Sequence, residues 1–210
     1  MDLFGPTRSM SLSGKKYGYV LVDDFSRYTW VFFLTHKYET FSEFQVFYKK
    51  IEQDEKFKIS NIQSDHGGEF QNNEFDQFCR TQGINQKFSS PRTLEQNGVV
   101  ERRNRTLVEM ARTMLIESNL PRKFWAEAIN TSCYIINKAM VRNSSKKTSY
   151  EMFKGKKPSL AHFRVFRTKC FIHINKKILI NLKQKVNQES FLVILRPLEL
   201  TEYIIWKMIL

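Results

Sequence analysis

The sequence predicts an α/β domain, and three observations support that prediction. Residues 17–24 (YGYVLVDD) and 28–34 (YTWVFFL) are rich in the aromatic and β-branched residues that favour strands. Apolar residues recur at steps of three and four over residues 38–53, which is the period of an amphipathic helix. Short strand-like and helix-like segments then alternate as far as residue 118. Such alternation is typical of a sheet covered by helices.

The elements of the first half follow in a definite order. A short polar joint between the first two strands predicts an antiparallel hairpin, and the helix over residues 38–53 comes next. Residues 59–63 predict a short strand that runs into Gly67 and Gly68, so Asp65 is expected at the end of a strand. Residues 73–82 predict a helix closed by Gly83, and residues 84–88 predict another short strand.

Two long helices are expected to complete the core. Residues 95–118 carry an apolar stripe, with Glu101 and Arg105 off that stripe. Pro121 opens a second helix that runs to about residue 139, and the polar run at residues 142–148 (RNSSKKT) indicates an exit linker. We therefore expect a core over residues 1–141, a basic linker and extension over residues 142–176, and a frame-shifted or decayed tail over residues 177–210.

The charge balance favours a polyanionic partner. The chain has 34 Lys and Arg residues against 21 Asp and Glu residues, a formal net charge of +13. Nucleic acid is the commonest partner of such a surface, although ribosomal, histone-like and membrane-surface proteins share this composition. The function therefore depends on the motifs.

Composition also excludes some classes of protein. The cysteines are odd in number and far apart, so we interpret them as packing residues in a reducing compartment, and no Cys or His pair has zinc-ligand spacing. No signal peptide is evident, and no stretch reaches the roughly 18 apolar residues of a membrane span. We expect a soluble intracellular protein that has no contact with membranes.

Two carboxylates have a spacing that suits metal chemistry. Asp65 ends a predicted strand and Glu101 lies early in a predicted helix, with 35 residues between them. In two-metal phosphoryl transfer, carboxylates hold a pair of Mg²⁺ ions about 3.5–4 Å apart, beside the attacking and the leaving oxygen. The alternative is structural: a solvated Asp at a turn, and a helical Glu paired with Arg105. Spacing alone leaves both interpretations open.

Four motifs, in one order, resemble those of copia-type LTR retrotransposon integrases. They are DLFGP at residues 2–6, DDFSRY at residues 23–28, SDHGGEF at residues 64–70 and QNGVVERRN at residues 96–104. The segments FWAEA at residues 124–128 and YIIN at residues 134–137 are similar to the same family's following helix. The resemblance covers roughly residues 1–170.

That resemblance implies a ribonuclease H-like fold, with a mixed five-stranded sheet flanked by helices. It also implies an acidic triad of Asp2, Asp65 and Glu101 that holds two Mg²⁺ (or Mn²⁺) ions. Asp23 and Asp24 are alternatives for the first carboxylate that reasoning from the residues leaves open. Since only Met1 precedes Asp2, we expect the first strand to be truncated.

Polar residues around the triad are candidates for DNA contacts. Asn97 precedes Glu101 by four residues, while Asn104 and Arg105 follow it within one turn, on what we expect to be the exposed side. Such side chains position a duplex more than they read its sequence. Arg102 and Arg103 are equally compatible with a solvated helix face. His66 is interpreted as a loop residue and not as a metal ligand.

The activity implied by the resemblance is metal-dependent integration of a transposable element. Activated water would cleave a phosphodiester to expose a 3′ hydroxyl, which would then attack target DNA in line. We expect DNA partners (element ends and target duplex), a homo-oligomer when active, and a nuclear location after passage through the cytoplasm. The truncated first strand and the lack of a zinc module motivate an alternative, a catalytically inactive DNA-binding remnant. A general ribonuclease H-like nuclease is a third possibility, without a reason to carry Trp125 and its neighbours.

Overall fold

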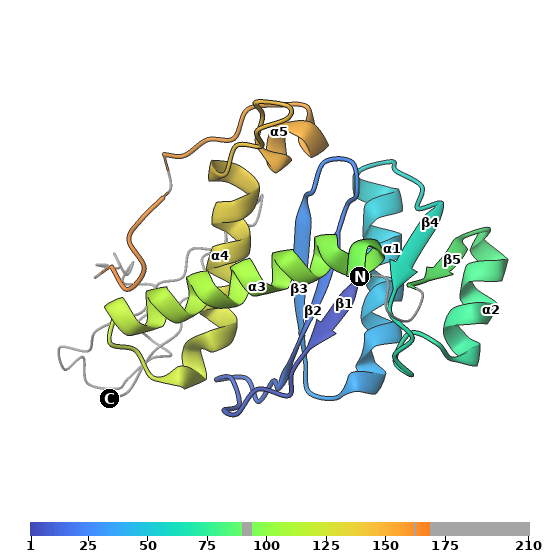
Figure 1. The fold of residues 1–210 in the computed structure, drawn as a ribbon, viewed down its shortest axis with the longest axis horizontal. Coiled ribbons are helices and arrows are strands. Elements are labelled where there is room, and N and C mark those ends of the chain that lie inside the picture. Colours follow the sequence, from blue (N-terminus) through green and yellow to red (C-terminus); the bar gives the residue numbers. More distant parts are fainter. Residues whose placement is uncertain (90–93, 162, 169–210) are drawn as a thin grey trace, which may run out of the picture. The chain divides into compact units, whose positions relative to one another are not determined.

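The computed structural model describes residues 1–89, 94–161 and 163–168, without the side chains of residues 94–97. Met1–Leu160 form one compact unit, shown as a ribbon in Figure 1. Of the second unit, Ala161–Leu210, only residues 161 and 163–168 are described. The tail predicted over residues 177–210 lies outside the described residues.

The strands form two ladders. Strands β1 (Asp2–Phe4), β2 (Tyr17–Val22) and β3 (Thr29–Leu34) are antiparallel in the order β1-β2-β3. Strands β4 (Asn61–Ser64) and β5 (Asn85–Phe88) are parallel. The amino group of Met1 donates to the Gln63 carbonyl oxygen at 2.6 Å, which joins the start of β1 to β4. The mixture of parallel and antiparallel strands is as predicted, but the five strands form two separate ladders and not one continuous sheet.

The predicted hairpin between β2 and β3 is confirmed. Its register pairs Tyr17 with Leu34 and Val22 with Thr29, so both strands end before the turn. The Asp23 carboxylate accepts from the backbone N–H and the hydroxyl of Ser26, and this closes the turn. The strands are therefore shorter than the sequence runs that predicted them.

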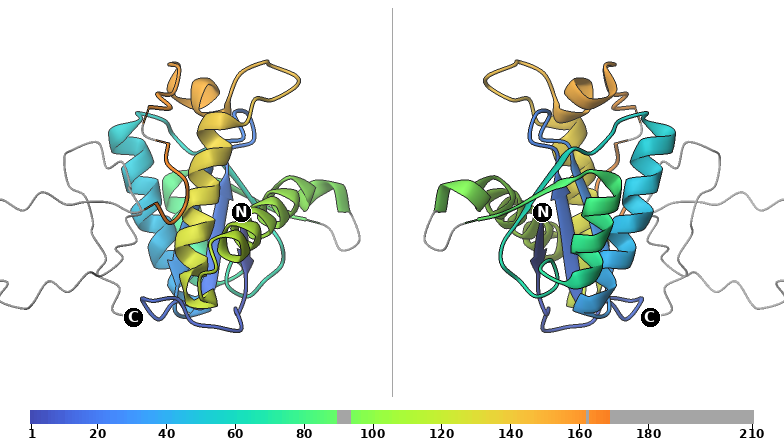
Figure 2. Two further views of the ribbon diagram at one scale, coloured as in Figure 1. Left: turned by 90° about the vertical axis from the view of Figure 1, so that its left-hand side faces the viewer. Right: turned by 90° about the vertical axis from the view of Figure 1, so that its right-hand side faces the viewer.

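One face of the three-stranded sheet packs against α1 (Thr40–Asp54), which follows the short 3-10 helix η1 (Lys37–Glu39). Phe47 of α1 contacts the rings of Trp30 and Phe32 on β3, at centroid distances of 5.1 and 5.8 Å. Figure 2 shows α1 alongside the sheet in two further views. The helix predicted from apolar spacing is thus confirmed, with its apolar face buried in the main core.

The opposite face of the sheet packs against α4 (Trp125–Ala139), which follows the 3-10 helix η2 (Arg122–Phe124). The Trp125 ring meets Phe33 edge-on at 5.4 Å. Asn137 accepts from the backbone N–H of Thr29 at 2.9 Å and donates to its carbonyl oxygen at 2.7 Å. Helix α3 (Leu94–Glu117) packs on α4 and on the β1 and β2 strands.

Helix α2 (Asn73–Gln82) has the predicted bounds. The Asn72 side chain accepts from the Phe75 N–H at 2.9 Å, and Gly83 ends the helix with a φ of 68°. Phe75 and Cys79 of this helix are buried in the main core. These caps are local interactions, which is why the sequence predicted the helix so closely.

The core extends past the boundary predicted at residue 141. Helix α5 (Ser149–Lys154), which begins with a Thr148–Glu151 capping box, packs against α4. Phe153 stacks on Tyr28 with centroids 4.7 Å apart, and Lys154 pairs with Glu55. The polar run expected to be an exit linker is therefore a turn within the compact unit, closed by the bridge between Val141 and Thr148.

Two predictions from composition find partial answers. Cys79 and Cys133 are free and buried, as expected of packing residues, and burial raises the pKa of the Cys133 thiol to about 12. None of the helices in the described part of the chain is long and apolar enough to cross a membrane.

Candidate functional site

Asp2 and Asp65 lie near each other at the junction of the two ladders. Asp2 begins β1 and Asp65 directly follows β4, and the bond from Met1 to Gln63 holds these strand ends together. Burial raises the pKa of Asp2, and the negative charge of Asp65 raises it further. Two carboxylates that repel in this way are stabilised by a cation between them. The pair is therefore chemically suited to one divalent metal ion.

Asn104 of α3 fixes the first carboxylate. Its side-chain amide donates to Asp2 Oδ2, while the backbone N–H of Leu3 donates to Asp2 Oδ1 at 2.9 Å. Asn104 is 7% exposed, and its own Oδ1 is buried with no hydrogen-bond partner. A buried amide oxygen can coordinate Mg²⁺ or accept a hydrogen bond from an ordered water. This orphaned oxygen beside Asp2 is a second feature that fits a metal ion.

The burial of Asn104 corrects our prediction that it lies on the exposed side of the helix, while its contact with DNA stays a prediction. Asn104 stands four residues after Val100 and three before Leu107, and both of these side chains are buried. The spacing of four and three places Asn104 within the apolar stripe of α3. The helical period was visible in the sequence, and it would have identified Asn104 as an inward-facing polar residue.

Asp65 occupies a tight turn with a third carboxylate nearby. Its Oδ1 accepts from the Gly67 N–H at 3.2 Å. A Cβ on Gly67 would meet the Glu69 carboxyl carbon at 2.8 Å and Asp65 Oδ1 at 3.1 Å, so both carboxylates face the same point. Glu69 also pairs with Lys37 at 3.4 Å. The sequence analysis quoted Glu69 within its motif but did not single it out. The available signal was Gly67, which lies between Asp65 and Glu69 and leaves room for both carboxylates.

Glu101 is not brought to the pair. It is exposed on α3, one residue before the exposed Arg102. No group of three His, Cys, Asp or Glu side chains that could hold a metal ion occurs among the residues the structure describes. The residues present thus fit one metal ion between Asp2 and Asp65, and the three-carboxylate set is not assembled.

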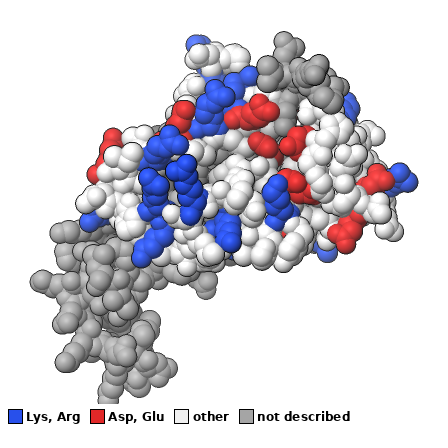
Figure 3. Space-filling model, turned by 60° about the horizontal axis from the view of Figure 1, so that its bottom comes forward, with Lys and Arg blue, Asp and Glu red and all other residues white. Residues whose placement is uncertain are grey.

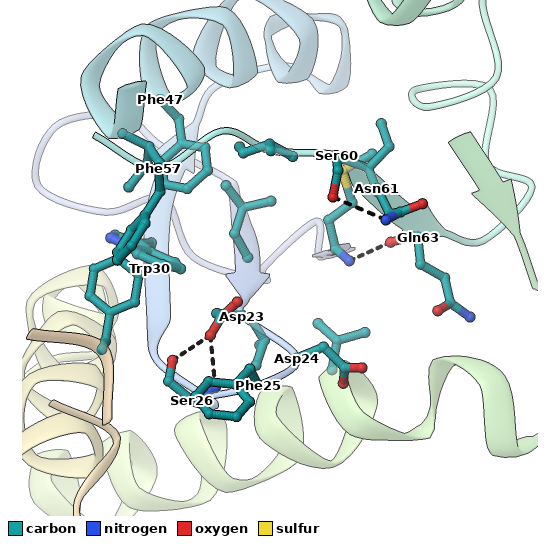
Figure 4. A pocket seen from close by; sticks show the side chains of 18 of the residues that line it. Asp23, Asp24, Phe25, Ser26, Trp30, Phe47, Phe57, Ser60, Asn61 and Gln63 are labelled. Atoms are coloured by element: carbon teal, nitrogen blue, oxygen red, sulfur yellow. Dashed lines mark hydrogen bonds between the residues drawn. The ribbon is translucent and has the colours of Figure 1, made fainter. Parts of the chain in front are cut away.

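Asp23 and Asp24, the alternatives for the first carboxylate, are engaged elsewhere. Asp23 closes the hairpin turn through Ser26, and Asp24 forms an ion pair with Arg27. Both line a hollow of about 1010 Å³ between the hairpin, the start of β4 and α3 (Figure 4). In Figure 4, Asp23 points toward Ser26 within the turn. These bonds favour a structural role for Asp23 and Asp24.

The remaining predicted DNA contacts stay predictions. Arg105 is exposed on α3. The side chain of Asn97 lies outside the described residues. On the face drawn in Figure 3, Lys and Arg side chains gather in one band, beside a smaller group of Asp and Glu side chains. His66, which we interpreted as a loop residue, stacks on Phe88 with centroids 5.2 Å apart.

Comparison with known proteins identifies a family and several proteins that are similar to this chain. The family described as "Integrase core domain" matches residues 1–93. A retrovirus-related Pol polyprotein from transposon TNT 1-94 of Nicotiana tabacum is 37% identical over 84% of this chain. The corresponding polyprotein from transposon RE2 of Arabidopsis thaliana is 28% identical over 87%. The chain spans 13% and 12% of these two relatives.

Solved structures show the same fold. The HTLV-2 integrase catalytic core domain in complex with magnesium, in its trimeric form, is 25% identical with a TM-score of 0.53, covering 72% of this chain and 95% of that one. A chain of the simian T-cell lymphotropic virus intasome in complex with PP2A regulatory subunit B56 gamma is 20% identical with a TM-score of 0.57, covering 83% of this chain and 60% of that one. The ribonuclease H-like fold and the resemblance to copia-type integrases are thereby confirmed.

Proposed function

This chain belongs to the retroelement integrase cores, and we propose that it is a metal-dependent polynucleotidyl transferase that processes DNA 3′ ends and joins them to target DNA. The observation that carries the proposal is the pairing of Asp2 with Asp65 at adjoining strand ends. Asn104 holds the Asp2 carboxylate and the Gly67 N–H holds that of Asp65. The Met1 ammonium group offsets part of the repulsion between the two carboxylates, and a divalent cation bound between them would offset it further.

The residues of the site would divide the work as follows. Asp2 and Asp65 would hold Mg²⁺ or Mn²⁺, and Asn104 would keep Asp2 oriented. Glu101, which the structure does not bring to this pair, would have to approach it to contribute a third carboxylate. A bound divalent ion lowers the pKa of water and neutralises charge on a phosphate. Water would cleave a phosphodiester to leave a 3′ hydroxyl, which then attacks a target phosphate in line and releases a target 3′ hydroxyl. No covalent bond to the protein is needed.

DNA would be held mainly through its phosphates. The net charge of +13, the exposed Arg105 and the band of basic side chains in Figure 3 support this. Asn97 would lie near the cut end. We further propose that the active form is a homo-oligomer that acts in the nucleus, as an integrase must reach chromosomal DNA; the HTLV-2 relative has trimeric and dimeric forms.

A second candidate function is favoured by the position of Glu101. Glu101 is exposed and apart from Asp2 and Asp65. In this second candidate, the chain is a DNA-binding remnant that does not bind metal productively. The two candidates share DNA binding and differ in metal-dependent cutting.

Two charge-removing variants separate them. Asp65→Asn and Glu101→Gln are expected to abolish Mg²⁺- or Mn²⁺-dependent cutting and joining of an element-end duplex, because an amide keeps the shape and loses metal affinity. DNA binding should stay within a few fold, as measured by anisotropy. Asp76→Asn, which removes an exposed carboxylate on α2, is the matched control. Cutting by both site variants at the unmodified rate would exclude the proposal, and no cutting by the unmodified chain would favour the remnant.

A further inference from the structure

Arginines from separate parts of the chain converge beside the hairpin between β2 and β3. Arg27 belongs to the hairpin, Arg102 and Arg103 lie near the start of α3, and Arg142 follows α4. We call Arg27, Arg102, Arg103 and Arg142 the arginine cluster. Three of them line a depression of about 220 Å³, whose walls are Arg27, Val99, Arg102, Arg103 and Thr106. Arginine thus supplies three of the five residues that line the depression.

Backbone contacts hold two members of the cluster in place. Arg103 Nη2 donates to the Arg27 carbonyl oxygen at 3.4 Å, and Arg142 Nη1 donates to the Phe25 carbonyl oxygen at 2.6 Å. Each guanidinium has five N–H donors, so both keep donors for another acceptor. The hairpin carbonyls therefore organise the cluster without using up its hydrogen-bonding capacity.

The positive charge of the cluster is mostly uncompensated. Asp24 pairs with Arg27, but its side chain is 92% exposed. Arg102, Arg103 and Arg142 form no ion pair over the residues the structure describes. Burial lowers the pKa of Arg103, and the charges of Arg27 and Arg142 lower it further. Arginines held together against their repulsion are stabilised by an anion.

Gly98 gives the Arg102 guanidinium its room. A Cβ at this position would stand 2.9 Å from Arg102 Nη1, and its three nearest neighbours would all be atoms of the Arg102 guanidinium. The Arg102 head group therefore lies over the bare backbone of Gly98, one turn earlier on α3. Any larger residue at position 98 would displace it.

We propose that the arginine cluster binds one phosphate of a DNA backbone. Planar guanidinium groups match the oxygens of a phosphate, and several of them around one depression fit a single phosphate group. The inference rests on the proposed function in taking DNA as the polyanion. It adds a contact that is distinct from Arg105 and that includes Arg27 and Arg142, which the sequence did not single out.

The salt dependence of DNA binding tests this site. The full chain and its variants are titrated into a labelled DNA duplex without metal, over a range of NaCl concentrations. Loss of one phosphate contact reduces the slope of log K against log salt by about 0.9. The Arg102→Gln/Arg142→Gln variant is expected to show this reduction. The matched control Lys49→Gln/Lys50→Gln removes the same charge from exposed positions on α1 and should keep the original slope.

A second measurement uses inorganic phosphate alone as the probe. Phosphate should raise the Tm of the unmodified chain above its value in NaCl of equal ionic strength, and the cluster variant should lose this rise. Circular dichroism establishes that both variants are folded; if the double variant unfolds, Arg102→Gln alone is used, because Arg102 is exposed. Equal slope reductions in the cluster and control variants, or no reduction in either, would overturn the site.

The two proposals fail separately. Undiminished cutting by Asp65→Asn excludes the proposed chemistry and leaves the slope result intact. An unchanged slope in the cluster variant, alongside metal-dependent cutting by the unmodified chain, excludes the phosphate site and leaves the chemistry intact.

Discussion

The two faces of the three-stranded sheet are held by different kinds of contact. On the α1 face, buried rings such as Phe44 and Phe47 fill the space to the sheet and to α2, and Phe44 lies 5.2 Å from Phe75. On the opposite face, apolar contacts such as that of Trp125 with Phe33 are combined with hydrogen bonds from buried polar side chains of α4 and α3. Asn137 bonds the Thr29 backbone and Asn104 bonds the Asp2 carboxylate.

This difference indicates that the residues that stabilise the fold are largely distinct from those that position the candidate metal site. Apolar burial has no directional requirement and provides most of the free energy of folding. Hydrogen bonds contribute less free energy but fix positions and directions, which a metal site needs. The α1 face can therefore stabilise the fold while the α3 face carries like charges at Asp2 and Asp65. Four substitutions test this division, from the largest expected effect to the smallest.

Phe44→Ala is expected to destabilise the chain most. Phe44 is 1% exposed, and removing a buried phenyl ring costs about 3–5 kcal/mol. Urea denaturation followed by circular dichroism measures the change. Val46→Ala on the same helix is the control, since Val46 is 62% exposed and should change stability by less than about 0.5 kcal/mol. Similar losses for both would mean that burial of the Phe44 ring against the sheet is not what stabilises the α1 face.

Asn137→Ala is expected to cost on the order of 2–3 kcal/mol, because it leaves buried backbone groups of Thr29 without their Asn137 partner. The same denaturation measurement applies. Asn130→Ala makes the same change on a partly buried position of α4 and should be close to neutral. A loss at position 137 no greater than at position 130 would mean that the polar contacts do not hold α4 to the sheet.

Asn104→Ala is expected to change stability by no more than about 1 kcal/mol. It removes the hydrogen bond to Asp2, but it also removes a buried oxygen that has no partner, and these effects oppose each other. The rise in Tm that Mg²⁺ produces should decrease markedly, since Asp2 loses its orientation. Asn104 would have no part in metal binding if that rise were as large in Asn104→Ala as in the unmodified chain.

Gly98→Ala is expected to have the smallest effect on stability, a gain of up to about 1 kcal/mol from helix propensity. Its Cβ displaces the Arg102 guanidinium, so the DNA salt slope should become shallower while stability is kept or raised. Gly155→Ala tests the opposite case: with a φ of 68° at the end of α5, it should lose stability and keep the slope. A loss of stability at position 98, or a slope that stays unchanged, would contradict a separate role for this face.

The sequence by itself determined the elements whose signals are local. The bounds of α2 follow from Asn72, Gly83 and the apolar spacing between them, and the hairpin follows from two β-prone runs. Caps, turns and helical periods act over a few residues, so they can be predicted without knowledge of the rest of the chain. The family resemblance likewise depended only on the order of short motifs, and the comparisons confirmed it.

The tertiary structure decided which distant residues meet. Asp2 approaches Asp65 through a single bond between Met1 and Gln63, and Asn104 reaches Asp2 from a helix about a hundred positions later. The compact unit reaches Leu160, and Phe153 of its last helix stacks on Tyr28. The arginine cluster joins a hairpin, a helix start and a residue after α4. These contacts depend on how elements pack in three dimensions, and no local pattern in the sequence specifies them.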